Sequence, residues 1–327
     1  MPIDVAAVLR DALPAGAAPH RLTVFGASVP DAALGLVQSA ALAAGWQIRS
    51  SQFDSGAGYE ANVWELRYDG GASPLSPGGT VEAGALRDAL RDALRGESES
   101  VGALEFALVG GALATPGPKM LIMDVDSTLI RQEVIELLAA RAGVEDRVRA
   151  VTEAAMRGEL DFAQSLHERV ATLAGLPASV IDDVVAEVQF TPGALELVQA
   201  FRSAGHPVTV VSGGFRQILE PLAARAHIDE HLANDLEIVD GHLTGRVLGA
   251  VVDSDTKARM LREWAAKYGV GTESVVAVGD GANDIPMVQA AGLGVAFNAK
   301  PALREVAHVE LDLPSLAPVR LFAELES

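Results

Sequence analysis

The sequence of 327 residues contains no cysteine, which excludes disulfide bonds, thiolate metal sites and a cysteine nucleophile. Basic residues are scarce: 25 Lys and Arg stand against 44 Asp and Glu, for a formal charge of -19. Because this charge repels nucleic acid and anionic lipid, we expect neither as a partner. It also repels a phosphorylated ligand, so any phosphate site needs a local cation or metal.

Long hydrophobic runs are also absent. The most apolar early stretch, Ala32–Trp46, is interrupted by Gln38 and Ser39 and is shorter than the ~20 residues that span a bilayer. The first residues, MPIDVAAVLR, lack the charged-then-apolar pattern of a secretory signal. We therefore expect a cytoplasmic protein without a membrane partner, and its 49% hydrophobic content is enough for the cores of two domains.

A linker is predicted at Pro116–Pro118, where two prolines flank a glycine between apolar runs. It divides the chain into domains at 1–117 and 118–327. The first has the order β-α-β-β-α-β, which fits a small α+β ferredoxin-like sandwich, although other α+β arrangements are compatible. Its expected elements are strands at Arg21–Phe25, Gln47–Phe53, Ala61–Tyr68 and Leu104–Val109, with helices at Asp31–Ala44 and Val81–Leu94.

Beyond the linker, apolar strands alternate with helical segments, which predicts an α/β domain with a Rossmann-like parallel sheet covered on both faces. The roughly 80 residues between its first two strands are longer than an ordinary crossover and indicate an inserted helical cap, near 132–190. Asp240-Gly241 predicts a type I′ hairpin turn. The expected strands are Met120–Met123, Val208–Val211, Ser274–Val278 and Leu293–Ala296.

Polar residues follow the first two of these strands directly. Asp124 and Asp126 come after the first, at the edge where open α/β sheets bind ligands. Ser212 and Gly213 follow the second, just before a helix, so a hydroxyl and backbone N–H groups gather at a positive helix terminus suited to phosphate. Each pattern alone also fits a solvated turn or a helix cap.

Two further signals lie at the next strand ends. Lys257 is expected to open a helix over Ala258–Tyr268, where a cation is unfavourable unless an anion is nearby, although a lone lysine is more often a surface residue. Asp280, Asn283 and Asp284 follow the third strand and offer oxygen ligands of the kind Mg²⁺ prefers, with helix capping as the alternative. All four signals converge on one crevice.

Together these residues resemble the four motifs of the haloacid dehalogenase superfamily of phosphohydrolases. The resemblance to its phosphoserine phosphatase branch covers residues 120 to 312 and is carried by MDVDSTLIRQEVIELLA, LDFAQSLHERVATLAGL, TPGALELV, VVSGGF and VGDGANDIPMVQAAGLGVAFNAKP.

This resemblance implies a phosphatase that hydrolyses O-phosphoserine, in the last step of serine biosynthesis, through an aspartyl-phosphate intermediate on Asp124. Asp126 is then the general acid and base. The implied cofactor is Mg²⁺, held by Asp124, the backbone carbonyl of Asp126, Asp280, and Asp284 directly or through water. The residues implied to hold or orient the phosphoryl oxygens are Ser212, Gly213, Lys257 and Asn283.

Substrate selection is implied to lie in the cap. Glu133 would bind the ammonium and Arg169 the carboxylate, while Met156 and Phe162 would close over the substrate. Without the resemblance, Glu133 fits a helix-start acid, Arg169 a surface ion pair and Phe162 plain core. The alternatives are a phosphatase for another small phosphomonoester and a non-catalytic amino-acid sensor.

The resemblance also implies that residues 1–117 form an ACT-like regulatory or dimerisation domain, which makes a homodimer one expected assembly. The turn from Gly26 to Asp31 departs from the Asp-Arg-Pro-Gly pattern common at ACT ligand sites. Dimerisation or shielding of an interface is therefore the simpler expectation for this domain.

Overall fold

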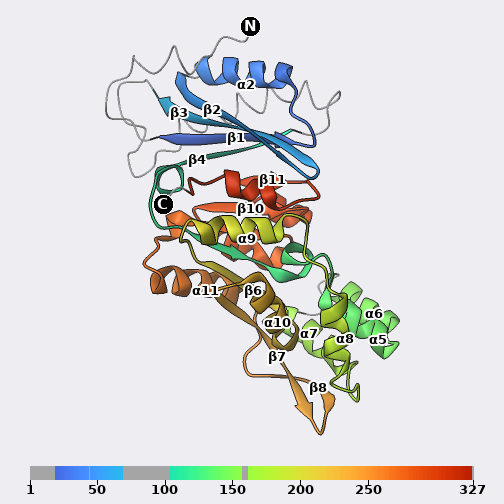
Figure 1. The fold of residues 1–327 in the computed structure, drawn as a ribbon. Helices are drawn as coiled ribbons and strands as arrows, with labels where there is room; N and C mark the ends of the chain where they lie inside the picture. The colour runs from blue at the N-terminus through green and yellow to red at the C-terminus, as the bar shows by residue number, and fades with distance from the viewer. Residues whose placement is uncertain (1–18, 44, 69–103, 157–160, 326–327) are drawn as a thin grey trace.

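The computed structural model describes residues 19–43, 45–68, 104–156 and 161–325 (Figure 1). Its N-terminal part is an antiparallel sheet with the order β2-β3-β1-β4. Helix α2 (Asp31–Ala43) packs Ala33 and Val37 against one face of this sheet. The predicted α+β arrangement is confirmed, while the helix expected at Val81–Leu94 lies outside the described residues. The strands are β1 (His20–Gly26), β2 (Trp46–Gly56), β3 (Tyr59–Tyr68) and β4 (Glu105–Gly110).

The other face of this small sheet packs on the C-terminal segment of the same chain. The rings of Phe25 and Phe322 lie 5.1 Å apart, and both belong to the large hydrophobic core. Arg320 donates to both carboxylate oxygens of Asp54, at 2.8 and 2.9 Å. Arg320 follows Pro318 in the short helix η5 (Ala317–Leu321), which therefore lies between the two sheets. Helix α2 and the C-terminal segment therefore pack on opposite faces of the small sheet.

A second sheet of seven strands has the order β11-β10-β9-β5-β6-β7-β8, and all its neighbours except β7 and β8 are parallel. The predicted parallel sheet is thus confirmed. Its central strands are buried throughout because helices cover both faces, which explains their unbroken apolar sequences. The strands are β5 (Met120–Met123), β6 (Val208–Phe215), β7 (Glu230–Val239), β8 (His242–Leu248), β9 (Val275–Gly279), β10 (Leu293–Phe297) and β11 (Val309–Leu311).

Alternate residues of each central strand face opposite helix layers. On one face Leu121 and Met123 belong to the same core cluster as α9 (Ala194–Ser203) and α10 (Arg216–Ala226). On the other face Met120 and Ile122 pack in the cluster of α11 and α12. The helices that contribute residues to this second cluster are α11 (Ser254–Lys267), α12 (Ile285–Ala290) and α13 (Pro301–Arg304).

The predicted helical insertion follows β5, and Figure 1 shows it as a separate group of helices beside the sheet edge. The β7–β8 hairpin reaches this cap: Gly175 N–H donates to the Leu243 carbonyl, and Leu243 N–H donates to the Leu176 carbonyl, both at 2.8 Å. Its turn has positive φ at Asp240 (49°) and Gly241 (74°), as a type I′ turn requires. The cap helices are α5 (Val134–Ala142), α6 (Glu145–Met156), α7 (Phe162–Ala171) and α8 (Val180–Glu187).

The expected start of the helix after Lys257 is wrong. Helix α11 begins at Ser254, and the side chain of Asp253 caps it by accepting a hydrogen bond from Thr256 N–H at 2.8 Å. Lys257 therefore lies inside the first turn rather than opening the helix. Among the described residues no helix is both long and apolar enough to cross a membrane.

Candidate active site

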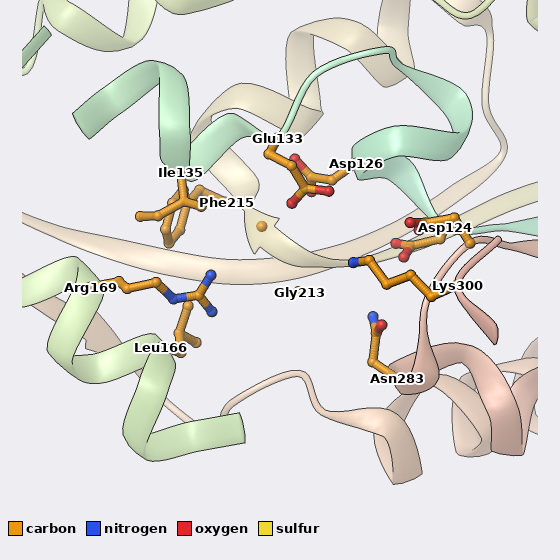
Figure 2. A pocket seen from close by; sticks show the side chains of 12 residues that line it. Asp124, Asp126, Glu133, Ile135, Leu166, Arg169, Gly213, Phe215, Asn283 and Lys300 are labelled. Atoms are coloured by element: carbon orange, nitrogen blue, oxygen red, sulfur yellow. The ribbon is translucent and has the colours of Figure 1, made fainter. Parts of the chain in front are cut away.

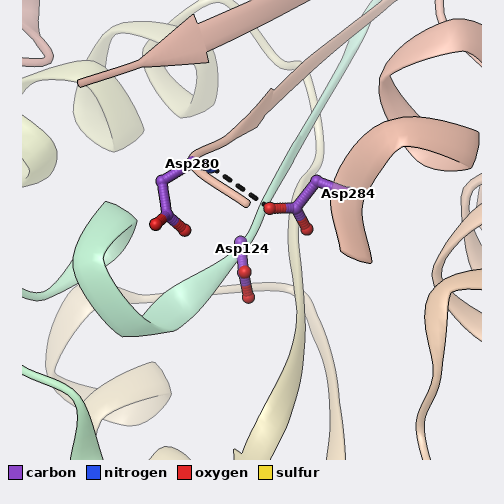
Figure 3. Close-up of side chains that lie close together, drawn as sticks. All are labelled: Asp124, Asp280 and Asp284. Atoms are coloured by element: carbon purple, nitrogen blue, oxygen red, sulfur yellow. Dashed lines mark hydrogen bonds between the residues drawn. The ribbon is translucent and has the colours of Figure 1, made fainter. Parts of the chain in front are cut away.

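Three carboxylates meet at the carboxyl ends of β5 and β9. Asp124 directly follows β5, whereas Asp280 and Asp284 lie in the turn between β9 and α12 (Figure 3). Each offers an oxygen, and these oxygens lie within 4.8 Å of one another. All three side chains are buried, with exposed fractions of 4%, 9% and 0%. Parallel strands end at one edge, so residues 160 positions apart are brought together there.

Lys257 joins two of these carboxylates. Its ammonium lies 2.7 Å from Asp124 Oδ2 and 2.7 Å from Asp284 Oδ1, and the side chain is fully buried. The other oxygen of Asp284 accepts the N–H groups of Asp280 and Gly281, each at 3.1 Å. Asp284 is therefore held by three donors, which fixes both the turn and the lysine.

The charge of this cluster is unbalanced. Burial and the charge of Asp284 raise the pKa of Asp124 well above its usual range, against the opposing effect of Lys257. The same two causes, burial first, raise the pKa of Asp280 to about 7. Burial would lower the pKa of Lys257, but Asp124 and Asp284 more than offset this and raise it, so the lysine stays charged. One ammonium among three oxygen-donor carboxylates leaves excess negative charge, and these residues fit a divalent metal ion.

Asp126 points away from the carboxylate cluster. Its Oδ1 accepts the Val134 N–H at 2.7 Å and its Oδ2 accepts the Ser212 hydroxyl at 3.0 Å, while Gly214 N–H donates to Ser212 Oγ at 2.7 Å. Burial, with a contribution from Glu133, raises the pKa of Asp126 to about 6. A carboxyl group with such a pKa can give and take a proton near neutral pH.

Asp124 and Asp280 line a cavity of about 170 Å³ between the sheet and the cap (Figure 2). Seven of the predicted site residues line it. Three others do not line the cavity but contact residues that do: Lys257 contacts Asp124, Ser212 contacts Asp126, and Asp284 contacts Asp280. The lining residues are Asp124, Asp126, Glu133, Ile135, Leu166, Arg169, Gly213, Gly214, Phe215, Asp280, Asn283 and Lys300.

Two opposite charges enter the cavity from the cap. Glu133 is the N-cap residue of α5 and accepts the Ser127 hydroxyl at 2.7 Å, while Arg169 extends from α7 and donates its Nε–H to the Ser165 carbonyl at 3.2 Å. Burial lowers the pKa of Arg169, and the charge of Glu133 opposes this shift. The backbones of Met156 and Phe162 end α6 and begin α7, but their side chains are outside the described part of the chain.

Sequence reasoning missed Lys300, Ile135, Leu166, Gly214 and Phe215. Lys300 is the N-cap of α13, and its N–H donates to the Asp280 carbonyl at 2.8 Å, so the loop after β10 is tied to the loop after β9. Figure 2 shows its ammonium directed into the cavity toward Gly213. The sequence signal that could have found Lys300 is its position shortly after β10, a buried parallel strand. Leu166 lies one helical turn before Arg169 and thus shares its face.

The fold and this site define a haloacid dehalogenase-like hydrolase. The model of that family matches residues 121–289, which is more than half of the chain, and the chain belongs to this family.

Curated relatives are named phosphoserine phosphatase. One from Mycobacterium tuberculosis is 57% identical over 216 residues, covering 66% of this chain and 53% of the relative. Another, from Streptococcus thermophilus, is 50% identical over 200 residues, covering 61% of this chain and 93% of the relative. The chain spans little more than half the length of the first of these relatives.

Solved structures agree in fold. A phosphoserine phosphatase holding an analogue of a phospho-aspartyl intermediate is 38% identical, with a TM-score of 0.61, and covers 64% of this chain and 100% of that one. A haloacid dehalogenase family hydrolase from Salmonella enterica serovar Typhi is 25% identical, with a TM-score of 0.75, and covers 93% of this chain and 99% of that one. The second structure thus covers a larger share of this chain than the first.

Proposed function

We propose that this chain is a phosphoserine phosphatase that hydrolyses O-phosphoserine to serine and phosphate. One observation carries the proposal: a single cavity contains Asp124 together with Glu133 and Arg169, an anion and a cation that match the ammonium and carboxylate of the substrate. The names of the relatives support the same substrate. A phosphomonoester without these two charged groups would leave Glu133 and Arg169 without ligands.

Asp124 is the nucleophile in this proposal. One of its oxygens attacks the phosphorus, the bond from phosphorus to the serine oxygen breaks, and an aspartyl phosphate forms. Asp126 gives its proton to the departing serine oxygen. Water then attacks the phosphorus, Asp126 takes a proton from that water, and Asp124 is released with inorganic phosphate. The raised pKa of Asp126, about 6, supports its double role.

The proposed metal is Mg²⁺. Asp124, Asp280 and the backbone carbonyl of Asp126 would hold it, with Asp284 acting directly or through a water. When bound, the ion offsets the negative charge of the phosphoryl group and of the carboxylates around it.

The phosphoryl oxygens are held by four residues of this chain. Ser212 and the N–H of Gly213 lie at the end of β6, Asn283 lines the cavity, and Lys257 contributes its charge from 2.7 Å beyond Asp124 Oδ2. The Gly213 N–H is a backbone donor, whereas the Ser212 hydroxyl, which donates to Asp126 in this structure, would turn toward the phosphoryl group when substrate binds.

The proposal extends to the rest of the chain. The hydrolase domain takes residues 118–327 with a cap near 132–190, in which Met156 and Phe162 close over the substrate. Residues 1–117 form an ACT-like domain that regulates the enzyme or mediates a homodimer. The protein acts in the cytoplasm, on a small molecule, in serine biosynthesis.

Phosphate release from a panel of phosphomonoesters with Mg²⁺ tests this function. Asp124→Asn should abolish turnover of every substrate. Arg169→Ala should lower kcat/KM for phosphoserine by roughly 10²-fold, because a bidentate charge pair with the substrate carboxylate is removed. Its effect on substrates without a carboxylate should be far smaller. Arg141→Ala is the matched control, since Arg141 is an exposed cap residue paired with Glu187. Equal losses on all substrates in Arg169→Ala would refute the proposed specificity.

A further inference from the structure

Ser127, which hydrogen-bonds to the cavity-lining residue Glu133, has a strained backbone. Its φ is 55° and its ψ is 4°, in the left-handed region that non-glycine residues rarely adopt. Three other described non-glycine residues share a positive φ, and they end a helix, form the hairpin turn or follow β10: His227, Asp240 and Asn298. Ser127 alone among them lies between two proposed site residues, Asp126 and Glu133. A left-handed residue of this kind costs roughly 1 kcal/mol, so neighbouring contacts must hold it.

The hydroxyl of Ser127 makes the contact that explains this conformation. It donates to Glu133 Oε1 at 2.7 Å. The N–H of the same residue donates to the Gln132 carbonyl at 3.3 Å, and Ile130 N–H donates to the Val125 carbonyl at 3.0 Å. These bonds fold the segment after Asp124 back on itself, so that the loop with the proposed nucleophile meets the start of the first cap helix.

Glu133 lies among like and opposite charges, since its carboxylate acts on Arg169 as well as on two carboxyl groups of the cavity. The charge of Glu133 acts on both Asp126 and Asp280, which are the nearby carboxyl groups of the cavity. At the N-cap of α5 the Glu133 side chain makes no capping hydrogen bond. Repulsion from the carboxylates favours rotamers that turn it out of the cavity. The hydroxyl of Ser127 opposes this by a charge-assisted hydrogen bond to one carboxylate oxygen.

We propose that Ser127 is a positioning residue for ammonium recognition: its strained backbone and its hydroxyl hold one oxygen of Glu133, so that the other oxygen faces the substrate. This inference rests on the proposed function and deepens it. The left-handed backbone conformation is needed for this role, because it directs the short Ser127 side chain toward Glu133 from the loop that also contains Asp124 and Asp126.

Three substitutions separate the hydroxyl from the strain. Ser127→Ala removes the hydroxyl and keeps the strain, Ser127→Gly removes both, and Ser127→Asn keeps a donor on a residue that tolerates positive φ. Loss of a hydrogen bond to a charged group should lower kcat/KM for phosphoserine by about tenfold in the Ala and Gly variants, mainly through KM. Ser127→Asn should recover much of this loss. Thermal unfolding should show Ser127→Gly to be at least as stable as Ser127→Ala.

Substrate analogues and a double-mutant cycle make the assignment specific. Phosphoethanolamine, which keeps the ammonium, should show the same loss, whereas 3-phosphoglycerate, which has a hydroxyl in its place, should show none. In a Glu133→Gln background, Ser127→Ala should cause no further loss.

A uniform fall of kcat on all three substrates, additive effects in the cycle, or unchanged kinetics in Ser127→Ala and Ser127→Gly would overturn the role of Ser127. A wild-type protein without preference for phosphoserine over 3-phosphoglycerate would overturn the proposed function as well.

Discussion

Replacing Lys257 by methionine should expose the charge imbalance of the site. The lysine is fully buried and its ammonium lies 2.7 Å from both Asp124 and Asp284. Methionine keeps the apolar stem but leaves the carboxylates without their cation. Breaking a buried ion pair in this way costs about 3–5 kcal/mol. For a chain of this size each kcal/mol lowers the melting temperature by roughly 2–4 °C, so we expect a fall on the order of 10 °C in metal-free buffer.

Mg²⁺ should restore part of this loss, because a divalent ion replaces the missing positive charge and binds only the folded state. Lys119→Met is the matched control: Lys119 is also fully buried, but its ammonium donates to the carbonyls of Thr115 and Gly117, away from the carboxylates. Melting curves with and without Mg²⁺ should show a larger Mg²⁺ effect in Lys257→Met than in wild type or Lys119→Met. An equal Mg²⁺ effect in all three proteins would refute the electrostatic reasoning.

Three further results are expected. Gly214→Ala should lower kcat by roughly 10²-fold, since a Cβ there would lie 2.7 Å from Asp126 Oδ2, while Gly35→Ala, which has open space around it, should leave kinetics unchanged. Lys300→Gln should lower kcat/KM at low salt and flatten its salt dependence, because Lys300 brings an exposed cation to an acidic cavity. In metal-free protein the raised pKa of Asp280, about 7, means that folding takes up a proton, so unfolding free energy should fall as pH rises from 4 to 7. That slope should weaken in Asp280→Asn, as measured by urea unfolding.

The central strands were predictable because burial on both faces leaves only apolar residues in them, as in Val275–Gly279. Strand β7 (Glu230–Val239) was expected only in part, as one arm of the hairpin. Its polar residues belong to a strand that leaves the sheet to reach the cap. Strand β11 has three residues, too few for a pattern. The first residues of α11 are polar, so apolar periodicity does not reveal its start, which is marked instead by the capping residue Asp253.

Within the site, residues that follow strands in sequence could be assigned to one crevice because parallel strands end together. Lys300 obeys the same rule but lacks a chemical signal, since a lysine before a proline is common in loops. The proposed role of Ser127 depends on its positive φ and on the way the loop from Asp124 to Glu133 folds back on itself. No local sequence pattern predicts either feature.

The most direct test of the central claim is to trap the covalent intermediate. The protein is mixed with phosphoserine labelled in its phosphoryl group, quenched in acid within the turnover time, and its peptides are mapped by mass spectrometry. The account predicts that the label is on the peptide containing Asp124 and is absent from Asp124→Asn. Turnover without a labelled peptide, or a label on another residue, would contradict it.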